Sequence, residues 1–279
     1  MRIIKTFFLL ALLALFVKPA TAAEFRHRGV TLPKKTAKYG LMGLGYLPQF
    51  EVESLYGLNI PQSEPFVTQV INHLQKNNQS ALNSPIDLDG QKSGLNIGFG
   101  FKSNSMFRFE GMLTVAQGRR ILINTPFTAD TTVNNGNANY TTSTTFSNVD
   151  VMTRYASLML NTYLDSDFSI FRSYIGAGLG LNILTGSIRG NTNFGTGIQT
   201  DQVSTAFKYS NFGIGGNVTV GTQILVSKAV AIDIAFRQFF SVASFSSVSG
   251  SGGVNKTVTT QSPAKHTMQM ISLGMVFYF

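Results

Sequence analysis

Apolar residues occupy every second position at the end of the chain: Ile271, Leu273, Met275, Phe277 and Phe279. A period of two is typical of a β-strand whose two faces meet different surroundings. The pattern recurs seven more times along the chain. It predicts eight strands, at about residues 38–48, 93–102, 106–117, 150–164, 168–184, 208–226, 230–240 and 267–279.

The connections between these strands alternate between short and long. Tight turns are expected near 102–105, 165–167 and 227–229, and long connections over about 49–92, 118–149, 185–207 and 241–266. A soluble antiparallel barrel with its apolar face inward would show the same strand pattern, but it would not need this alternation. The layout is typical of outer-membrane barrels. We predict an all-β fold: an eight-stranded antiparallel up-and-down transmembrane β-barrel with short periplasmic turns and four long extracellular loops.

The N-terminus resembles an export signal. Arg2 and Lys5 precede the apolar run 7–17, and Ala20-Thr21-Ala22 forms a small-residue cleavage site. A retained membrane anchor is the alternative, but the run is too short to span a bilayer. We predict a cleaved signal peptide at 1–22, a basic periplasmic tail at 23–38 and the barrel at 39–279.

Composition and charge narrow the function classes. The chain has no cysteine, which excludes disulfides, thiol catalysis and cysteine-based metal sites. Its formal charge of +9 includes three cations in residues 1–22 and a net +4 in 23–38, which leaves only about +2 for the barrel. The basicity is therefore local to the tail, and no nucleic-acid surface is indicated. No cofactor or metal is predicted.

Four short segments carry a family resemblance. They are Phe109-Glu110-Gly111, 161–165 (NTYLD), 172–180 (RSYIGAGLG) and Ala235-Phe236-Arg237. In this order the chain resembles the OmpA-like eight-stranded outer-membrane β-barrel superfamily over about 39–279, in particular its surface-antigen and opacity-protein branches. The resemblance implies that the final strand and Phe279 are an insertion signal for the barrel-assembly machinery. The chain departs from the pattern by lacking Trp, by its long first loop and by having no peptidoglycan-binding domain after the barrel, so an anchoring role does not carry over.

Four charged residues fall on the face assigned to the lumen: Arg108 and Glu110 on one strand, and Asp233 and Arg237 on another. An eight-stranded barrel is only wide enough to be filled by side chains. Buried charges need partners, so these four are predicted to form an ion-pair network that plugs the lumen. A narrow gated channel is the alternative.

A lipid-modifying enzyme on this fold would need a serine, a histidine base and a carboxylate in contact. His27 lies in the tail and His73 in the first loop, and only His266 lies at a strand mouth, with no family motif around it. No enzymatic activity is predicted, and a lipid-modifying enzyme stays the weaker alternative.

The loops suggest a surface role. The first contains a helical pattern that starts at Ser63-Glu64-Pro65 and places Phe66, Val70 and Leu74 on one stripe, expected to pack on the barrel mouth rather than contact another molecule. Loop two, with Asn134-Asn135-Gly136 at its tip, is expected to be an extended hairpin. We expect a non-enzymatic surface protein of the bacterial outer membrane, membrane-structural and antigenic, with adhesion as a further role. Its expected partners are outer-membrane lipid and lipopolysaccharide, the barrel-assembly machinery, and a host-surface or matrix ligand.

Overall fold

Eight antiparallel strands close a ring within the residues that the structure describes. The computed structural model describes residues 37–52, 65–77, 84–90, 92–103, 106–124, 127–134, 139–168, 170–193, 202–250, 255–256 and 266–279. The ring follows chain order: β1 (Ala37–Val52), β3 (Ser93–Lys102), β4 (Phe107–Ile123), β6 (Asn139–Phe168), β7 (Phe171–Asn193), β8 (Gln202–Leu225), β9 (Val230–Gly250) and β11 (Thr267–Tyr278). The predicted eight-stranded up-and-down barrel is confirmed.

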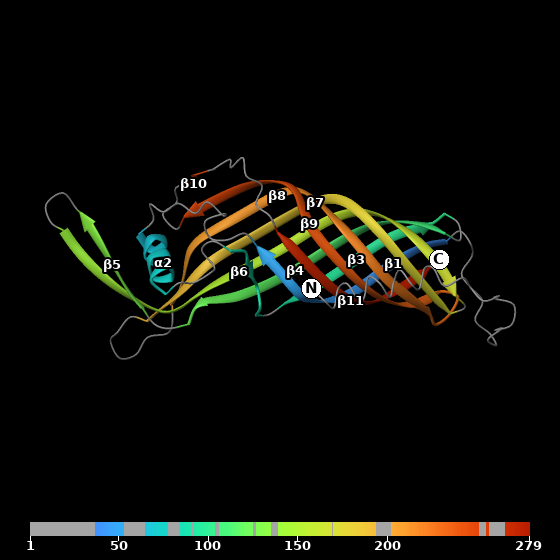
Figure 1. The fold of residues 1–279 in the computed structure, drawn as a ribbon, viewed down its shortest axis with the longest axis horizontal. Coiled ribbons are helices and arrows are strands. Elements are labelled where there is room, and N and C mark those ends of the chain that lie inside the picture. The colour runs from blue at the N-terminus through green and yellow to red at the C-terminus, as the bar shows by residue number, and fades with distance from the viewer. Residues whose placement is uncertain are drawn as a thin grey trace.

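The barrel closes between its first and last strands. β1 pairs with β11 from Tyr39 opposite Tyr278 to Glu51 opposite Thr267, with a bulge between Tyr46 and Gln49. We call the end of the barrel that carries the C-terminus and the short connections the turn end, and the opposite end the loop end. In Figure 1 the C-terminus marks the turn end, whereas the short strands β5 (Phe127–Asn134) and β10 (Asn255–Lys256) lie at the loop end.

Several strands are longer than the sequence pattern predicts, mostly toward the loop end. β6, β7, β8 and β9 have 30, 23, 24 and 21 residues, so polar segments assigned to loops are in fact paired. About 9–11 residues suffice to cross a bilayer. The remainder of these strands therefore continues the same sheet beyond the part that faces lipid. The expected hairpin of loop two is present as β5 paired with β6, while its tip at 135–138 lies outside the described residues.

The turn predicted at 165–167 is wrong. β6 continues to Phe168, which pairs with Phe171. Asp165 is consequently a buried strand residue with an inward side chain. The expectation failed because polar residues were taken as a turn signal, although a charged lumen places polar residues inside the strands as well.

Burial separates the two faces of the barrel wall. Large apolar side chains point outward, with Leu160 74%, Leu44 71% and Leu273 61% exposed, whereas Arg108 and Arg237 are inside and only 1% exposed. A soluble protein rarely exposes such a continuous apolar surface. An apolar exterior around charged interior positions is the arrangement of a barrel that crosses lipid.

A segment of the first loop closes the loop end. The helix α2 (Pro65–Lys76) contributes Ile71 and Leu74, and the residues around strand β2 (Ile86–Asp87) contribute Ile86 and Leu88, to one buried apolar cluster with the barrel wall. The predicted helix is therefore present, and its described part packs on the barrel mouth.

Among the described residues, no helix combines the length and apolar character needed to cross a membrane. The predicted signal peptide and all but the last two residues of the predicted tail lie outside the described residues.

Candidate functional site: the filled lumen

Seven charged side chains line the lumen toward the turn end. All are buried because each occupies an inward position of its strand. They come from β3, β4, β6, β7 and β9 and comprise Lys102, Arg108, Glu110, Asp165, Arg172, Asp233 and Arg237. Such charges are stable in a barrel interior only when partners compensate for the lost water.

Arg108 is paired with Asp165 rather than with Glu110. Its Nε lies 3.2 Å from Asp165 Oδ1, and Lys102 Nζ lies 3.6 Å from Asp165 Oδ2. The guanidinium of Arg108 also stacks over two aromatic rings, 4.3 Å from the centre of Tyr174 and 4.4 Å from that of Tyr163. Ion pairing and cation–π contact together hold this cation in the lumen.

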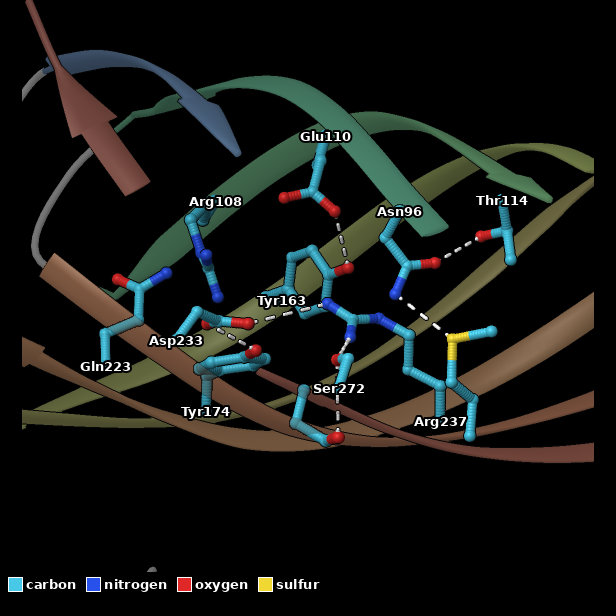
Figure 2. A network of polar contacts seen from close by, with 12 residues as sticks. Asn96, Arg108, Glu110, Thr114, Tyr163, Tyr174, Gln223, Asp233, Arg237 and Ser272 are labelled. Carbon is cyan, nitrogen blue, oxygen red and sulfur yellow. Dashed lines mark hydrogen bonds and ion pairs between the residues drawn. The ribbon is translucent and has the colours of Figure 1, made fainter. Parts of the chain in front are cut away.

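Glu110 is held by two tyrosines. Tyr39 donates a 3.0 Å hydrogen bond to Glu110 Oε2, and Tyr163 donates a 2.9 Å bond to Oε1. Figure 2 shows the Tyr163 hydroxyl, from the neighbouring strand β6, directed at this carboxylate. Hydrogen bonds to a charged acceptor are about twice as strong as neutral ones, so the two hydroxyls stabilise the ionised carboxylate.

Asp233 and Arg237 form a second group on β9. Their side chains are 3.7 Å apart, Tyr174 donates a 2.8 Å hydrogen bond to Asp233 Oδ1, and Arg237 donates through Nη1 to Ser272 Oγ. These contacts are drawn together in Figure 2.

Tyrosines join the two charged groups into one network. Tyr163 contacts both Glu110 and Arg108, Tyr174 contacts both Arg108 and Asp233, and the two rings pack edge-to-face 5.3 Å apart. The four charged residues singled out from the sequence thus lie in one buried cluster. They are connected through aromatic hydroxyls and rings rather than by direct pairing of the two strands.

Sequence reasoning missed more than half of this network. It left out Lys102, Asp165 and Arg172, and all the tyrosines. Arg172 donates through Nη1 a 2.7 Å hydrogen bond to the Tyr278 hydroxyl, which in turn donates a 2.6 Å bond to Gln223. Applying the two-residue alternation to every position of the predicted strands, and extending strand 150–164 by one residue to Asp165, would have placed these residues inward.

The lumen changes character toward the loop end. Asn96 marks the boundary: it accepts a 2.8 Å hydrogen bond from Thr114 and directs its Nδ2 at the sulfur of Met270, 3.1 Å away (Figure 2). Beyond it most of the buried side chains are apolar, although a few polar ones, among them Thr153, Asn211 and His266, are buried between them. Tyr155 packs against Phe50 and Phe239, and the cluster continues through methionine and leucine side chains to α2.

His266, the candidate base of a lipid-modifying enzyme, lies directly before β11 at the loop end. Its ring packs edge-to-face on Tyr155 at 5.4 Å, and its Nε2 lies 3.5 Å from Asn182 Nδ2. Burial lowers the pKa of His266 to about 4, which keeps the ring neutral at pH 7. Within the described part of the chain, no serine or carboxylate hydrogen-bonds to this ring, and no group of three acidic or histidine side chains is placed to hold a metal.

The five residues named as the insertion signal all face outward. Their exposed fractions range from 43% to 68%: Ile271, Leu273, Met275, Phe277 and Phe279. They form one apolar stripe along β11 beside the exposed side chains of β1 and β9.

The fold and lumen define a transmembrane β-barrel whose interior is occupied by its own side chains. No family model and no curated protein matches the sequence. Among solved structures, the chain is similar to Neisserial surface protein A (14% identity, 87% of this chain and 97% of that chain, TM-score 0.38). It is also similar to the attachment invasion locus protein Ail of Yersinia pestis (11%, 88% and 99%, TM-score 0.39) and to OprG of Pseudomonas aeruginosa (12%, 90% and 99%, TM-score 0.36). The fold assignment stands on the strand register of this chain.

Proposed function

We propose that this protein is a non-enzymatic, non-conducting β-barrel of the bacterial outer membrane that presents polar strands and loops at the cell surface. The observation that carries the proposal is the filling of the lumen along its length. A paired charge network fills the turn end, and an apolar core capped by α2 fills the loop end.

The two layers oppose ion flow for different reasons. In the charged layer, the carboxylates are already hydrogen-bonded or paired, so an entering ion would have to displace protein partners. In the apolar layer, an ion would lose its water without compensation, which costs many kcal/mol. A narrow gated channel would need both layers to rearrange.

The orientation follows from strand lengths. Short turns suit the periplasmic side, and the long strands β6–β9 with hairpin β5–β6 suit the outside. The apolar stripe on β11 with Phe279 supports its proposed role in insertion. The projecting segments are rich in Thr, Ser and Asn, as in 139–148, which suits polar contact with a host-surface or matrix ligand.

Single-barrel conductance tests the proposal. The refolded protein in a planar bilayer should show conductance near the baseline. Replacing Phe239, in the apolar layer, with Ser should increase it only if that layer is the barrier, and Leu273→Ser on the lipid face is the matched control. A large steady wild-type current unaffected by Glu110 and Asp165 variants would favour the channel instead.

Mass spectrometry of lipid A before and after incubation with the refolded protein tests the enzymatic alternative. Loss of acyl chains from the lipid would support that alternative.

A further inference from the structure

A cluster of basic side chains lies on the outside of the barrel, beyond the apolar belt at the loop end. Arg119 on β4, Arg154 on β6, Arg189 on β7 and Lys208 on β8 all occupy outward positions of adjacent strands. The Arg119 side chain is 47% exposed, Arg154 and Lys208 are exposed, and Arg189 is partly exposed. We call these four residues the basic rim.

Strand register brings the four cations together. Arg119 lies opposite Met152, two residues from Arg154, and Lys208 lies opposite Ser187, two residues from Arg189. Such diagonal neighbours are about 7–8 Å apart. Asp150 lies opposite Arg189 and joins the two halves of the basic rim.

One acidic residue only partly offsets the positive charge. Asp150 Oδ2 accepts a 2.6 Å charge-assisted hydrogen bond from Arg119 Nε, and the Asp150 side chain is 5% exposed. Arg189 donates a 3.1 Å hydrogen bond to Ser187, which holds it along the strand surface. Four cations against one carboxylate leave an excess of three positive charges. These contacts organise the rim rather than neutralise it.

Apolar residues lie below the basic rim, toward the turn end, on the same strands. Val115, Leu158, Ile183 and Phe212 are each 44–56% exposed and precede the cations toward the turn end by four to six residues along the strand. At about 3.3 Å per residue, this separation is about 13–20 Å along the strand, and the tilt of the strands makes it smaller along the barrel axis. The long side chains of arginine and lysine can extend back toward the exposed apolar residues. The surface is thus apolar below and basic above.

The opposite side of the barrel lacks this charge. On β1, β3, β9 and β11, the described outward residues that follow the belt include no cation: they are Pro48, Ser93, Gln238, Gln269 and the acidic Glu51. The basic rim is therefore a local feature of β4–β8, and a general need for charge at the membrane boundary does not explain it.

We propose that the basic rim binds the phosphate groups of a phosphorylated glycolipid in the outer leaflet, whose acyl chains lie on the exposed apolar residues of β4–β8. Arginine and lysine side chains supply charge-assisted hydrogen bonds to phosphate, and arginine does so through two N–H groups at once. This inference rests on the proposed outer-membrane location and names the lipid class that the surface selects.

The test compares two forms of one lipid. The full mature chain is refolded into phosphatidylcholine nanodiscs, and binding of diphosphorylated lipid A and of the same lipid after enzymatic dephosphorylation is measured by native mass spectrometry. We expect the wild type to bind the phosphorylated form at least about tenfold more tightly, because several charge-assisted contacts are lost without phosphate. Excess inorganic phosphate should compete only weakly, because it has no acyl chains.

A double variant locates the site. Arg154→Gln with Lys208→Gln should weaken binding of the phosphorylated lipid by about fivefold for each cation removed. The matched control, Lys38→Gln with Lys228→Gln, removes two exposed cations at the turn end and should leave binding unchanged. Lys208→Gln alone serves where the double variant fails to fold.

The outcomes separate the two proposals. Equal binding of both lipid forms, equal loss in the control variant, or full competition by inorganic phosphate, each with a heat-modifiable barrel inserted in the nanodisc, would overturn the lipid site and leave the outer-membrane proposal standing. Failure of the wild type to insert as a folded barrel would overturn the outer-membrane proposal and the lipid site with it.

Discussion

Asp165 is the residue on which the charged layer most depends. Its carboxylate is the shared partner of Arg108, at 3.2 Å, and Lys102, at 3.6 Å, and its side chain is fully buried. Replacing it with Asn preserves its volume but removes the carboxylate that the two buried cations share. Removing one partner of a buried ion pair costs about 3–5 kcal/mol, so Asp165→Asn should lower the free energy of unfolding by that amount.

Glu110 provides the internal comparison. Its two hydrogen bonds come from tyrosine hydroxyls, one to each carboxylate oxygen. In a glutamine variant one hydroxyl can still donate to the amide oxygen, and the other can rotate to accept from the amide N–H. Only the charge-dependent part of each bond is lost, so Glu110→Gln should cost about 2 kcal/mol. The ranking of the two variants therefore follows from their partners, because both carboxylates are similarly buried.

Urea unfolding of the barrel in lipid vesicles provides the assay. Far-ultraviolet circular dichroism is suitable because the chain has no Trp for fluorescence. Adding Lys102→Met to Asp165→Asn removes one of the two cations that have lost this shared carboxylate and should recover at least about 1 kcal/mol. A cost for Glu110→Gln equal to or larger than that of Asp165→Asn, or no recovery in the double variant, would refute the assigned pairing.

Three further predictions concern the barrel wall, the loop end and topology. Leu273→Arg, on the lipid face, should destabilise the inserted barrel by about 2–4 kcal/mol in the same assay, whereas Gln269→Arg, near the loop end of β11, should cost much less. Because the pKa of His266 is lowered to about 4, protons bind the unfolded state first, so stability should fall by about 3 kcal/mol between pH 7 and pH 4, and a His266→Phe variant should lack this part of the slope. A tag after Gly250 should be labelled on intact cells and a tag at Ser227 only after the envelope is opened; the reverse would contradict the orientation.

The barrel could be predicted from the sequence because the alternation that produces it involves residues that are adjacent in the chain. Residues such as Leu273 and Gly274 face opposite sides of the wall, and lipid on one side with a packed lumen on the other enforces alternation along every strand. The number of strands and the inward position of Arg108 and Asp233 follow from this period of two, and the up-and-down order follows from the alternation of short and long connections. The ends of the strands could not be predicted in this way, because the alternation disappears beyond the lipid while backbone pairing continues. Residues 139–148 of β6 are an example.

Only the tertiary structure decided which charges meet. Arg108 is paired with Asp165, 57 residues away, and Glu110 is held by Tyr39, 71 residues away, because strand register and lumen diameter fix which side chains face each other. The basic rim has the same origin: Arg119 and Lys208 are separate cations in the sequence, and the pairing of β4, β6, β7 and β8 places them on one side of the barrel. The period of two fixes the face on which a residue lies, and packing across the lumen and around the wall fixes its partners.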